Sequence, residues 1–361
     1  MGRKVMVAMS GGVDSSAAAW LLLQEGYTVS GITMQIWSAD ETTGSSLTAA
    51  DDARKVARLL GIPHQVVDLR EVFRRQVVDQ FCAEYLAGKT PNPCITCNRK
   101  LKFSALLEIA LAQGCDYIAT GHYARIGQDS SNGEMNLLTG LDPSKDQSYA
   151  LYRLNQHQLR HTLLPLGTCS KAEVRRLTAE ARLPVAAKAE SQDLCFVSDR
   201  HYGEFVERHL GLVPRPGPFR DTQGKVVGTH RGIHHYTIGQ RKGLGLPLGY
   251  PAYVTGIDPQ TNTIWVGANQ ELFQACLYAE DASWTSGSPL PGPTELAVKV
   301  RYSASPVAAL VTPLENHCFR VDFHQSQRAI TPGQAAVIYD GNRVVGGGTI
   351  TAHRQTPIKA K

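Results

Sequence analysis

The sequence predicts an α/β protein in which a doubly wound, Rossmann-like parallel sheet is followed by a small mixed central domain and a C-terminal β-barrel. Three observations carry this prediction. In the first 200 or so residues, short apolar segments alternate with helical ones; between residues 211 and 249, proline and glycine break that pattern; after residue 293, short alternating segments follow one another. The chain of 361 residues is more than twice the ~150 residues of a typical domain. We therefore expect domains at 1–210, 211–275 and 276–361.

The first domain contains four apolar segments that predict the strands of a parallel sheet: residues 5–9, 29–34, 65–68 and 117–120. Helical periodicity predicts the intervening helices at residues 16–25, 47–60, 71–86 and 101–113. Three of these helices are followed directly by a glycine, which readily adopts the left-handed conformation that ends a helix.

The remaining chain reads as β structure. A hairpin is predicted between residues 252–257 and 263–266, and a Pro/Gly/Ser linker at residues 286–293. Barrel strands are expected at residues 295–302, 307–312, 317–323, 334–339 and 343–351.

Charge and hydropathy limit the classes of function. The net charge is +5, and residues 200–245 contain eight basic and three acidic side chains, an excess of the same size. This window indicates either a surface that meets phosphates or a solvated basic face. No apolar run reaches the ~18 residues of a membrane span. The start of the chain also lacks the pattern of a secretion signal, so we expect a cytoplasmic protein with no membrane partner.

The strongest local motif is SGGVDSS at residues 10–16, between the first predicted strand and the first predicted helix. Glycines let backbone N–H groups approach an anion, hydroxyls add donors, and a helix N-terminus favours negative charge. An acidic residue in such a loop suits magnesium bound to a polyphosphate, so Asp14 is a candidate metal ligand. An ordinary tight turn is the alternative. The segment Gly88-Lys89-Thr90 is not a Walker A loop, because Ala83 replaces the first glycine and Pro91 follows.

Three of the eight cysteines lie among polar and turn residues: Cys94, Cys97 and Cys195. The prolines at 91 and 93 predict an extended, exposed turn, and the basic residues after Cys97 would lower the pKa of its thiol. A zinc or iron–sulfur site at Cys94 and Cys97 remains open, although no second close-set pair is visible. Cys195, beside leucine and phenylalanine, is by itself more typical of a core.

Taken in order, the motifs resemble those of the tRNA-specific 2-thiouridylases (the MnmA/TrmU family), within the N-type ATP pyrophosphatases or PP-loop enzymes. The resemblance covers essentially the entire chain. It rests on residues 10–16, 34, 90–94 with 97–98, 119–123, 145–149, 193–196, 237–245, 301–302 and 332–334.

The resemblance implies a role for each matching residue. ATP would be bound by Ala8, Met9, Ser10, Gly11, Gly12, Val13, Asp14 and Ser15, with Met34 and Gly121. Asn92, Pro93 and Cys94 would face the target base. His122, Lys145, Asp146, Gln147, Arg301, Tyr302 and Gln334 would contact tRNA. Cys195 would carry a persulfide and Cys97 would be the partner nucleophile, so that a Cys97–Cys195 disulfide forms during catalysis. Some relatives have aspartate in place of Cys94, so no role specific to that thiol is implied.

The reaction implied is ATP-dependent 2-thiolation of the wobble uridine of tRNA, with release of AMP and pyrophosphate. The expected cofactors are ATP and magnesium, without a permanently bound metal cluster. The expected partners are a tRNA with a wobble uridine, a persulfide sulfur-relay donor protein and a reductant. An amide-forming ligase, an iron–sulfur tRNA thiolase and a non-catalytic RNA-binding protein are the alternative functions.

Overall fold

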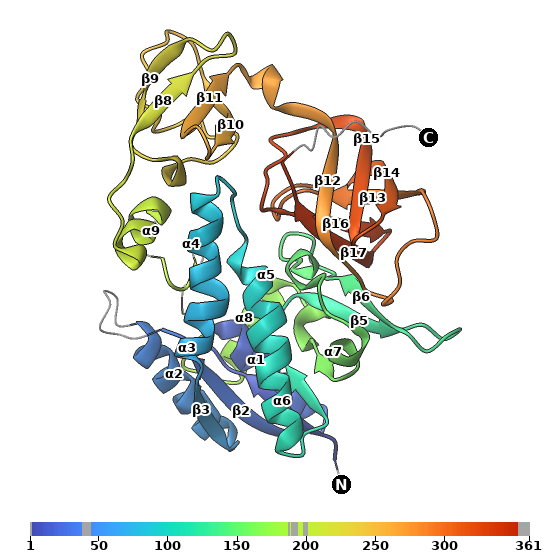
Figure 1. The fold of residues 1–361 in the computed structure, drawn as a ribbon. Helices are drawn as coiled ribbons and strands as arrows, with labels where there is room; N and C mark the ends of the chain where they lie inside the picture. The colour runs from blue at the N-terminus through green and yellow to red at the C-terminus, as the bar shows by residue number, and fades with distance from the viewer. Residues whose placement is uncertain (1, 38–44, 187, 189–193, 198–200, 353–361) are drawn as a thin grey trace.

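The structure is a computed structural model that describes residues 2–37, 45–186, 188, 194–197 and 201–352 (Figure 1). It contains three sheets: a five-stranded sheet near the N-terminus, a four-stranded central sheet and an eight-stranded C-terminal sheet. No helix in these ranges is both long and apolar enough to cross a membrane.

The N-terminal sheet is entirely parallel. Its strand order is β3 (His64–Asp68), β2 (Thr28–Gln35), β1 (Lys4–Ala8), β4 (Tyr117–Ala119) and β7 (Thr162–Leu163). The chain proceeds from β1 to β2 and β3 on one side and returns to β4 on the other side. The predicted doubly wound sheet is therefore confirmed, and its topological switch point lies between β1 and β4.

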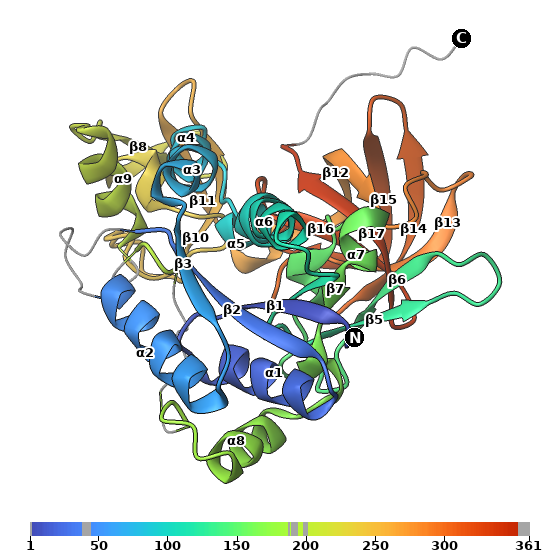
Figure 2. The same ribbon diagram turned by 90° about the horizontal axis from the view of Figure 1, so that it is seen from below.

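Helices cover both faces of this sheet (Figure 2). α1 (Val13–Gln24), α2 (Ser45–Leu60) and α8 (Lys171–Glu180) contribute to one core, which contains Val5 and Val7 of β1. Met6 points to the opposite core, with α4 (Asp79–Leu86) and α6 (Leu106–Ala112). The alternation within β1 follows from the two-residue period of a strand that is buried on both faces.

Two long helical segments cover the second face, and each contains a π-helical stretch. The first joins α3 (Arg70–Phe73), η1 (Arg74–Val78) and α4; the second joins α5 (Pro93–Cys97), η2 (Asn98–Ala105) and α6. The second of these helical segments was expected to start at residue 101, but it starts at Pro93. Proline is favoured in the first turn of a helix because its missing N–H has no partner there. The expected exposed turn around Cys97 is therefore wrong: Cys97 lies inside a continuous helical segment.

The segment between β4 and α8 was not assigned from the sequence. It forms the hairpin β5 (Ala124–Gln128) and β6 (Met135–Thr139), and then η3 (Ser148–Leu151), α7 (Gln156–Arg160) and η4 (Pro165–Thr168). Strand β6 pairs with β17 of the C-terminal sheet, so this hairpin ties the first domain to the barrel.

The central region begins with α9 (Tyr202–Leu210) and forms a small mixed sheet. Its strands are β8 (Gly217–Arg220), β9 (Val226–His230), β10 (Tyr253–Asp258) and β11 (Thr263–Gly267), with η5 (Ile233–His235) after β9. The predicted hairpin is confirmed as β10 and β11. The sheet has its own apolar core around Phe219, Val254 and Ile264.

The C-terminal sheet closes into the predicted barrel. Its strands follow η6 (Asn269–Leu272) and are β12 (Phe273–Trp284), β13 (Thr294–Lys299), β14 (Val307–Leu314), β15 (Cys318–Arg328), β16 (Ala335–Asp340) and β17 (Arg343–Ile350). Closure is completed by β12, which pairs with both β15 and β17. β12 was not predicted; residues 286–293 therefore connect two barrel strands. Because residue 275 lies within β12, the expected end of the central domain divides a strand.

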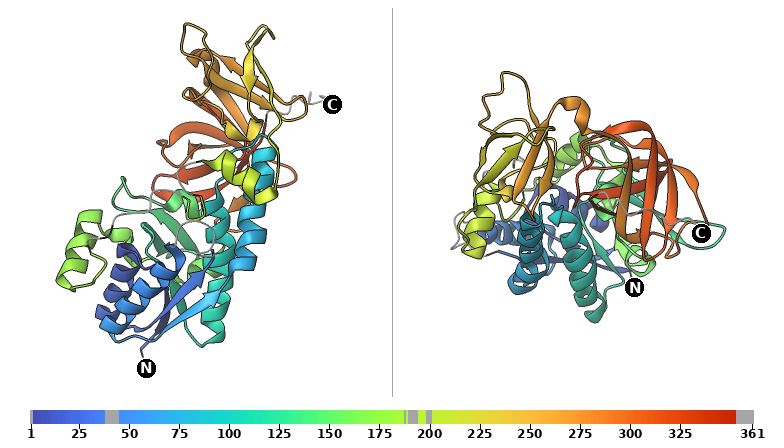
Figure 3. Two further views of the ribbon diagram at one scale, coloured as in Figure 1. Left: turned by 90° about the vertical axis from the view of Figure 1, so that its left-hand side faces the viewer. Right: turned by 45° about the horizontal axis from the view of Figure 1, so that its top comes forward.

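The central region and the barrel both contact the same short segment of the first domain (Figures 1 and 3). The N–H of Thr90 donates to the carbonyl of Pro332 at 2.8 Å, and the Thr90 hydroxyl donates to the Thr237 hydroxyl at 3.3 Å. This segment leads into α5. Both additional domains therefore contact the chain just before the helix that carries Cys94 and Cys97.

Candidate active site

The loop after β1 lies at the topological switch point, where ligands of open α/β sheets bind. Gly12 is the N-cap of α1 in an extended conformation, and no side chain caps the helix. The helix starts at Val13, not at residue 16 as expected, so Val13, Asp14 and Ser15 form its first turn. The N–H groups of a first turn have no acceptor within the helix. They point with the positive end of the helix dipole toward the space beyond the loop, which is an arrangement that binds anions.

Two glycines make this geometry possible. Gly11 has φ +67°, and a Cβ there would lie 2.3 Å from the carbonyl oxygen of Ala49. Gly121 follows β4, and a Cβ there would lie 2.7 Å from the carbonyl carbon of Asp14 and 2.8 Å from the nitrogen of Ser15. The segment after β4 therefore packs directly on the first turn of α1, as only glycine permits.

Internal hydrogen bonds hold the loop in this shape. The N–H of Ser10 donates to Oγ of Ser15 at 3.1 Å, and Oγ of Ser16 donates to the Gly12 carbonyl at 2.8 Å. The carbonyl of Met9 accepts from the buried Thr33 hydroxyl at 2.7 Å. The serines thus act mainly within the loop, and the backbone N–H groups are its remaining donors.

Basic side chains surround the loop. Nζ of Lys171 lies 2.7 Å and 2.9 Å from the two carboxylate oxygens of Asp14, and the Tyr123 hydroxyl donates to Asp14 at 2.7 Å. Nζ of Lys188 lies 3.1 Å from the Gly11 carbonyl and 3.0 Å from a carboxylate oxygen of Asp52. The loop and its lysines fit a polyphosphate, and Asp14 offers carboxylate oxygens that suit a magnesium ion. Sequence reasoning missed Lys171, although the capping box of Ser170 and Glu173 marks the start of its helix.

The three candidate thiols lie near one another. Cys94 and Cys97 are one helical turn apart on α5, and Cys195 lies in the segment 194–197. Cys195 interacts electrostatically with both of the other thiols and with Lys102. Phe196 anchors the segment: its ring centroid lies 5.2 Å from that of Phe81 and 5.3 Å from that of Phe205. Asp193, which belongs to the motif around Cys195, lies outside the described residues.

The pKa values of the three thiols are raised, opposite to the expectation for Cys97. Burial raises the pKa of Cys94 and Cys97 and outweighs the ammonium group of Lys102. Burial and the neighbouring thiols raise the pKa of Cys195 to about 12. The expectation is wrong because Cys97 sits within a buried helical segment and not at a helix N-terminus. Cys94 and Cys195 nevertheless have exposed surface. A thiol that is reached by solvent and is still surrounded by enough protein to raise its pKa indicates a concave site.

Thiol chemistry is open to all three residues, since each of the eight cysteines is present as a thiol. The Cys97–Cys195 disulfide, which is expected to form during catalysis, therefore stays a prediction.

Six of the seven residues expected to contact tRNA divide into two groups. Asp146 and Gln147 bind their own surroundings: Asp146 accepts from the N–H of Gly140 at 3.0 Å, and Gln147 accepts from the N–H of Tyr123 at 3.0 Å. The N–H of Lys145 donates to the carbonyl of Asp142 at 3.1 Å. His122 shares a hydrogen bond of 2.7 Å with Thr120, and burial, with a smaller effect of Lys102, holds its pKa well below the usual value.

The second group comes from the barrel. Tyr302 is exposed, its ring lies 6.0 Å from that of Tyr149, and its pKa is raised by burial and by the nearby Asp146 and Cys94. The ammonium of Lys299 lies 5.6 Å from each of these two ring centroids. Half-buried Arg301 precedes Tyr302 in the same loop. The barrel therefore brings an aromatic and cationic edge toward the thiols.

Other expected residues lie elsewhere. Gln334 donates its amide to the carbonyl of Thr90 at 2.8 Å, which is a contact within the protein. Asn92 and Pro93 line a hollow between α4, α5 and the barrel, together with Thr96 and Arg99. Cys94, the next residue of α5, is exposed and interacts electrostatically with Cys195. The role of these three residues at the target base stays a prediction. Half-buried Met34 is the last but one residue of β2, beside the neighbouring loop after β1.

Comparison with known proteins agrees with this architecture. Three family descriptions match in succession: "tRNA methyl transferase HUP domain" over residues 3–199, "tRNA methyl transferase PRC-barrel domain" over 203–268 and "Aminomethyltransferase beta-barrel domain" over 274–350. The chain is 51% identical to a tRNA-specific 2-thiouridylase MnmA of Moorella thermoacetica, over 97% of this chain and 100% of that protein. The chain belongs to the MnmA family.

A second MnmA relative, from Heliobacterium modesticaldum, is 49% identical over 97% of this chain and 93% of its own length. Among solved structures, a 4-thiouridine synthetase in complex with RNA and bound ATP covers 58% of this chain and 50% of its own, with 18% identity and a TM-score of 0.37. The full-length matches show that the MnmA family shares all three parts of this chain, including the barrel.

Proposed function

We propose that this protein is an ATP-dependent tRNA sulfurtransferase that converts the wobble uridine of the anticodon to 2-thiouridine. The observation that carries the proposal is the combination of two sites on one domain. A phosphate-binding loop lies at the switch point of the sheet, and three thiols lie on the adjoining helix and segment. The membership of the MnmA family, at 51% identity over almost the full chain, supports the same reaction.

The loop would act in the first half of the reaction. ATP is cleaved between its α- and β-phosphates, and AMP is joined to the C2 oxygen of the uracil, which turns that oxygen into a good leaving group. The first-turn N–H groups of α1 and the ammonium groups of Lys171 and Lys188 would hold the phosphates. Magnesium, when bound, neutralises phosphate charge, and Asp14 is the residue proposed to face it.

The thiols would act in the second half. The terminal sulfur of a persulfide on Cys195 attacks C2, the C2–O bond breaks and AMP leaves. The Cys97 thiolate then attacks Sγ of Cys195, the bond between that Sγ and the transferred sulfur breaks, and the electron pair stays on the sulfur of 2-thiouridine. The products include a Cys97–Cys195 disulfide, so each turnover requires a persulfide donor and a two-electron reductant.

The high thiol pKa values fit a site that excludes water. An activated C2 that meets water is hydrolysed back to uridine, so a desolvated pocket protects the intermediate. The target base must leave the anticodon stack to enter such a pocket. Arg241 and Lys242 of the central region are exposed and would bind phosphates, which position the tRNA without reading its sequence.

The test is incubation of the purified protein with magnesium, ATP, an unmodified tRNA transcript carrying uridine at the wobble position, and a persulfide source. Nucleoside mass spectrometry should detect 2-thiouridine, with one AMP and one pyrophosphate released per modified base. The matched control is the same tRNA with cytidine at the wobble position. Methylated uridine, or sulfur incorporation without ATP, would exclude this function.

A further inference from the structure

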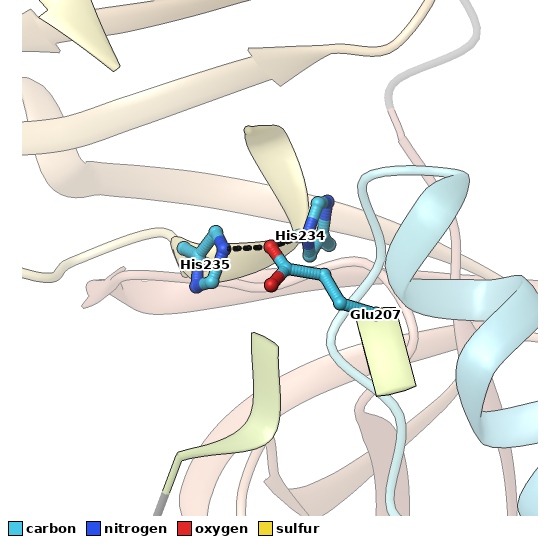
Figure 4. A group of neighbouring side chains, drawn as sticks. All are labelled: Glu207, His234 and His235. Atoms are coloured by element: carbon cyan, nitrogen blue, oxygen red, sulfur yellow. Dashed lines mark hydrogen bonds and ion pairs between the residues drawn. The ribbon is translucent and has the colours of Figure 1, made fainter. Parts of the chain in front are cut away.

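Two adjacent histidines and a glutamate meet between α9 and the turn η5 (Figure 4). Nε2 of His234 lies 3.0 Å, and Nε2 of His235 2.6 Å, from the same carboxylate oxygen of Glu207. One ligand atom from each residue lies within 4.8 Å of the other two. Neither the loop chemistry nor the sulfur chemistry uses these side chains.

The protein is shaped around this cluster. The side chains of His234 and His235 are only 4% and 3% exposed, and that of Glu207 is 21% exposed. A Cβ on Gly203, one turn before Glu207, would lie 2.0 Å from Nδ1 of His235. Gly232 has φ +145°, and a Cβ there would lie 2.7 Å from Cε1 of His234. Glycines on both sides therefore let the two rings converge on one carboxylate.

The chemistry of the cluster suits a metal ion. Imidazole nitrogen and carboxylate oxygen are ligands that zinc prefers in proteins, and here two imidazole nitrogens face one carboxylate oxygen. Metal binding would take the place of the two hydrogen bonds that now join the histidines to Glu207.

We propose that Glu207, His234 and His235 form a zinc site. Zinc in proteins is bound tetrahedrally at about 2.0 Å by imidazole nitrogen and carboxylate oxygen, with ligand atoms roughly 3.3 Å apart. The observed separations of 3.0 and 2.6 Å need only a small opening to admit the ion. The fourth ligand is water, which enters from the exposed side of Glu207.

The position of the site gives the ion a structural role. Zinc would join α9 to η5, and so to the central sheet. Phe205 of α9 packs on Phe196, with ring centroids 5.3 Å apart, and Phe196 follows Cys195 directly. The ion would therefore stabilise α9, on which the segment that carries Cys195 packs, without touching the reacting groups.

The test uses the full-length protein with Cys94, Cys97 and Cys195 changed to serine, so that these thiols do not compete for the metal. After treatment with a chelator, zinc and cobalt are titrated and the thermal midpoint is followed. We expect one zinc per chain, a higher midpoint with zinc, and the visible absorption of tetrahedral cobalt without thiolate charge-transfer bands. Glu207→Gln, which keeps the shape of the side chain, and His235→Gln should each weaken binding by at least about tenfold.

The matched control is His324→Gln, which removes an exposed histidine that is paired with one glutamate, Glu295, at 2.8 Å. This variant should bind zinc like its parent. Circular dichroism of every variant without metal separates loss of binding from loss of fold. Absence of zinc binding by the parent, or equal binding by parent and Glu207→Gln, would overturn the proposal.

Discussion

The side-chain amide of Gln334 in the barrel lies 2.8 Å from the carbonyl oxygen of Thr90 in the N-terminal domain, to which it donates a hydrogen bond. The N–H of Thr90 in turn donates to the carbonyl of Pro332 at 2.8 Å. A Cβ on Gly333 would lie 2.9 Å from the nitrogen of Thr90, so the two segments are in close contact. The barrel is thus bound to the residue that precedes the Pro91–Cys97 stretch, and the position of α5 depends on it.

Gln334→Ala is expected to loosen this junction. Loss of one hydrogen bond with a half-buried partner costs about 1 kcal/mol of unfolding free energy. Urea unfolding measures that change, with Gln327→Ala as the control, because the Gln327 amide donates to the exposed carbonyl of Gln325 at 2.8 Å, two residues away in the same strand. If the stability is unchanged and only tRNA affinity falls, Gln334 contacts tRNA and the junction does not depend on it.

Asp14→Asn should suppress adenylation. The substitution keeps the shape of the side chain but removes the charge that pairs with Lys171 at 2.7 Å and that would face magnesium. Removal of one preorganised charged group in such a site costs ~10²-fold or more in rate. Pyrophosphate release is the measurement, and tRNA affinity should change little. Asp51→Asn, which affects an exposed pair with Arg54, is the control. Normal pyrophosphate release by Asp14→Asn would show that this carboxylate is not part of the site.

The alkylation of Cys195 should be slow at neutral pH and should accelerate as the pH rises. Its pKa of about 12 lies three units above the ordinary value of 9.0, so at pH 8 the folded protein holds ~10³-fold less thiolate than a free thiol. Because the folded-state pKa is raised, the protonated thiol contributes stability that is present below pH 9 and lost between pH 9 and 12.

Peptide mass spectrometry after brief iodoacetamide treatment at several pH values measures this rate. The reference is the same protein unfolded in urea, in which Cys195 should react like an ordinary thiol. A plateau in the labelling rate near neutral pH in the folded protein would mean that the Cys195 thiol is activated, which would contradict its raised pKa.

Replacement of Arg241 and Lys242 by alanine should weaken tRNA binding and its dependence on salt. Both side chains are exposed, and each phosphate contact contributes close to one unit to the slope of log affinity against log salt. Filter binding across a salt series measures that slope. Arg176→Ala, an exposed substitution on the far helix α8, should leave it unchanged. An identical slope in both variants would mean that Arg241 and Lys242 form only a solvated face.

The sequence was sufficient for the fold class because local patterns determine it. The alternating apolar and helical segments predicted the parallel sheet, and the short strands after residue 293 predicted the barrel. Contacts between distant segments left no such pattern. Pro93 reads as a turn in sequence, but starts a helix that buries Cys97 and reverses the expected direction of its pKa shift. The pairing of Lys171 with Asp14 joins residues 157 positions apart, so only the folded chain shows it.

The role of the thiols is tested most directly by 2-thiouridine formed per enzyme, measured by mass spectrometry for Cys94→Ser, Cys97→Ser and Cys195→Ser with bound zinc and iron determined in parallel. Serine has no persulfide chemistry, so Cys97→Ser and Cys195→Ser should each abolish thiolation while they still fold, bind tRNA and release pyrophosphate. Cys94→Ser should retain substantial activity. Equal loss of metal and activity in the Cys94 and Cys97 variants, with Cys195→Ser fully active, would contradict the sulfur-transfer mechanism and identify a metal site instead.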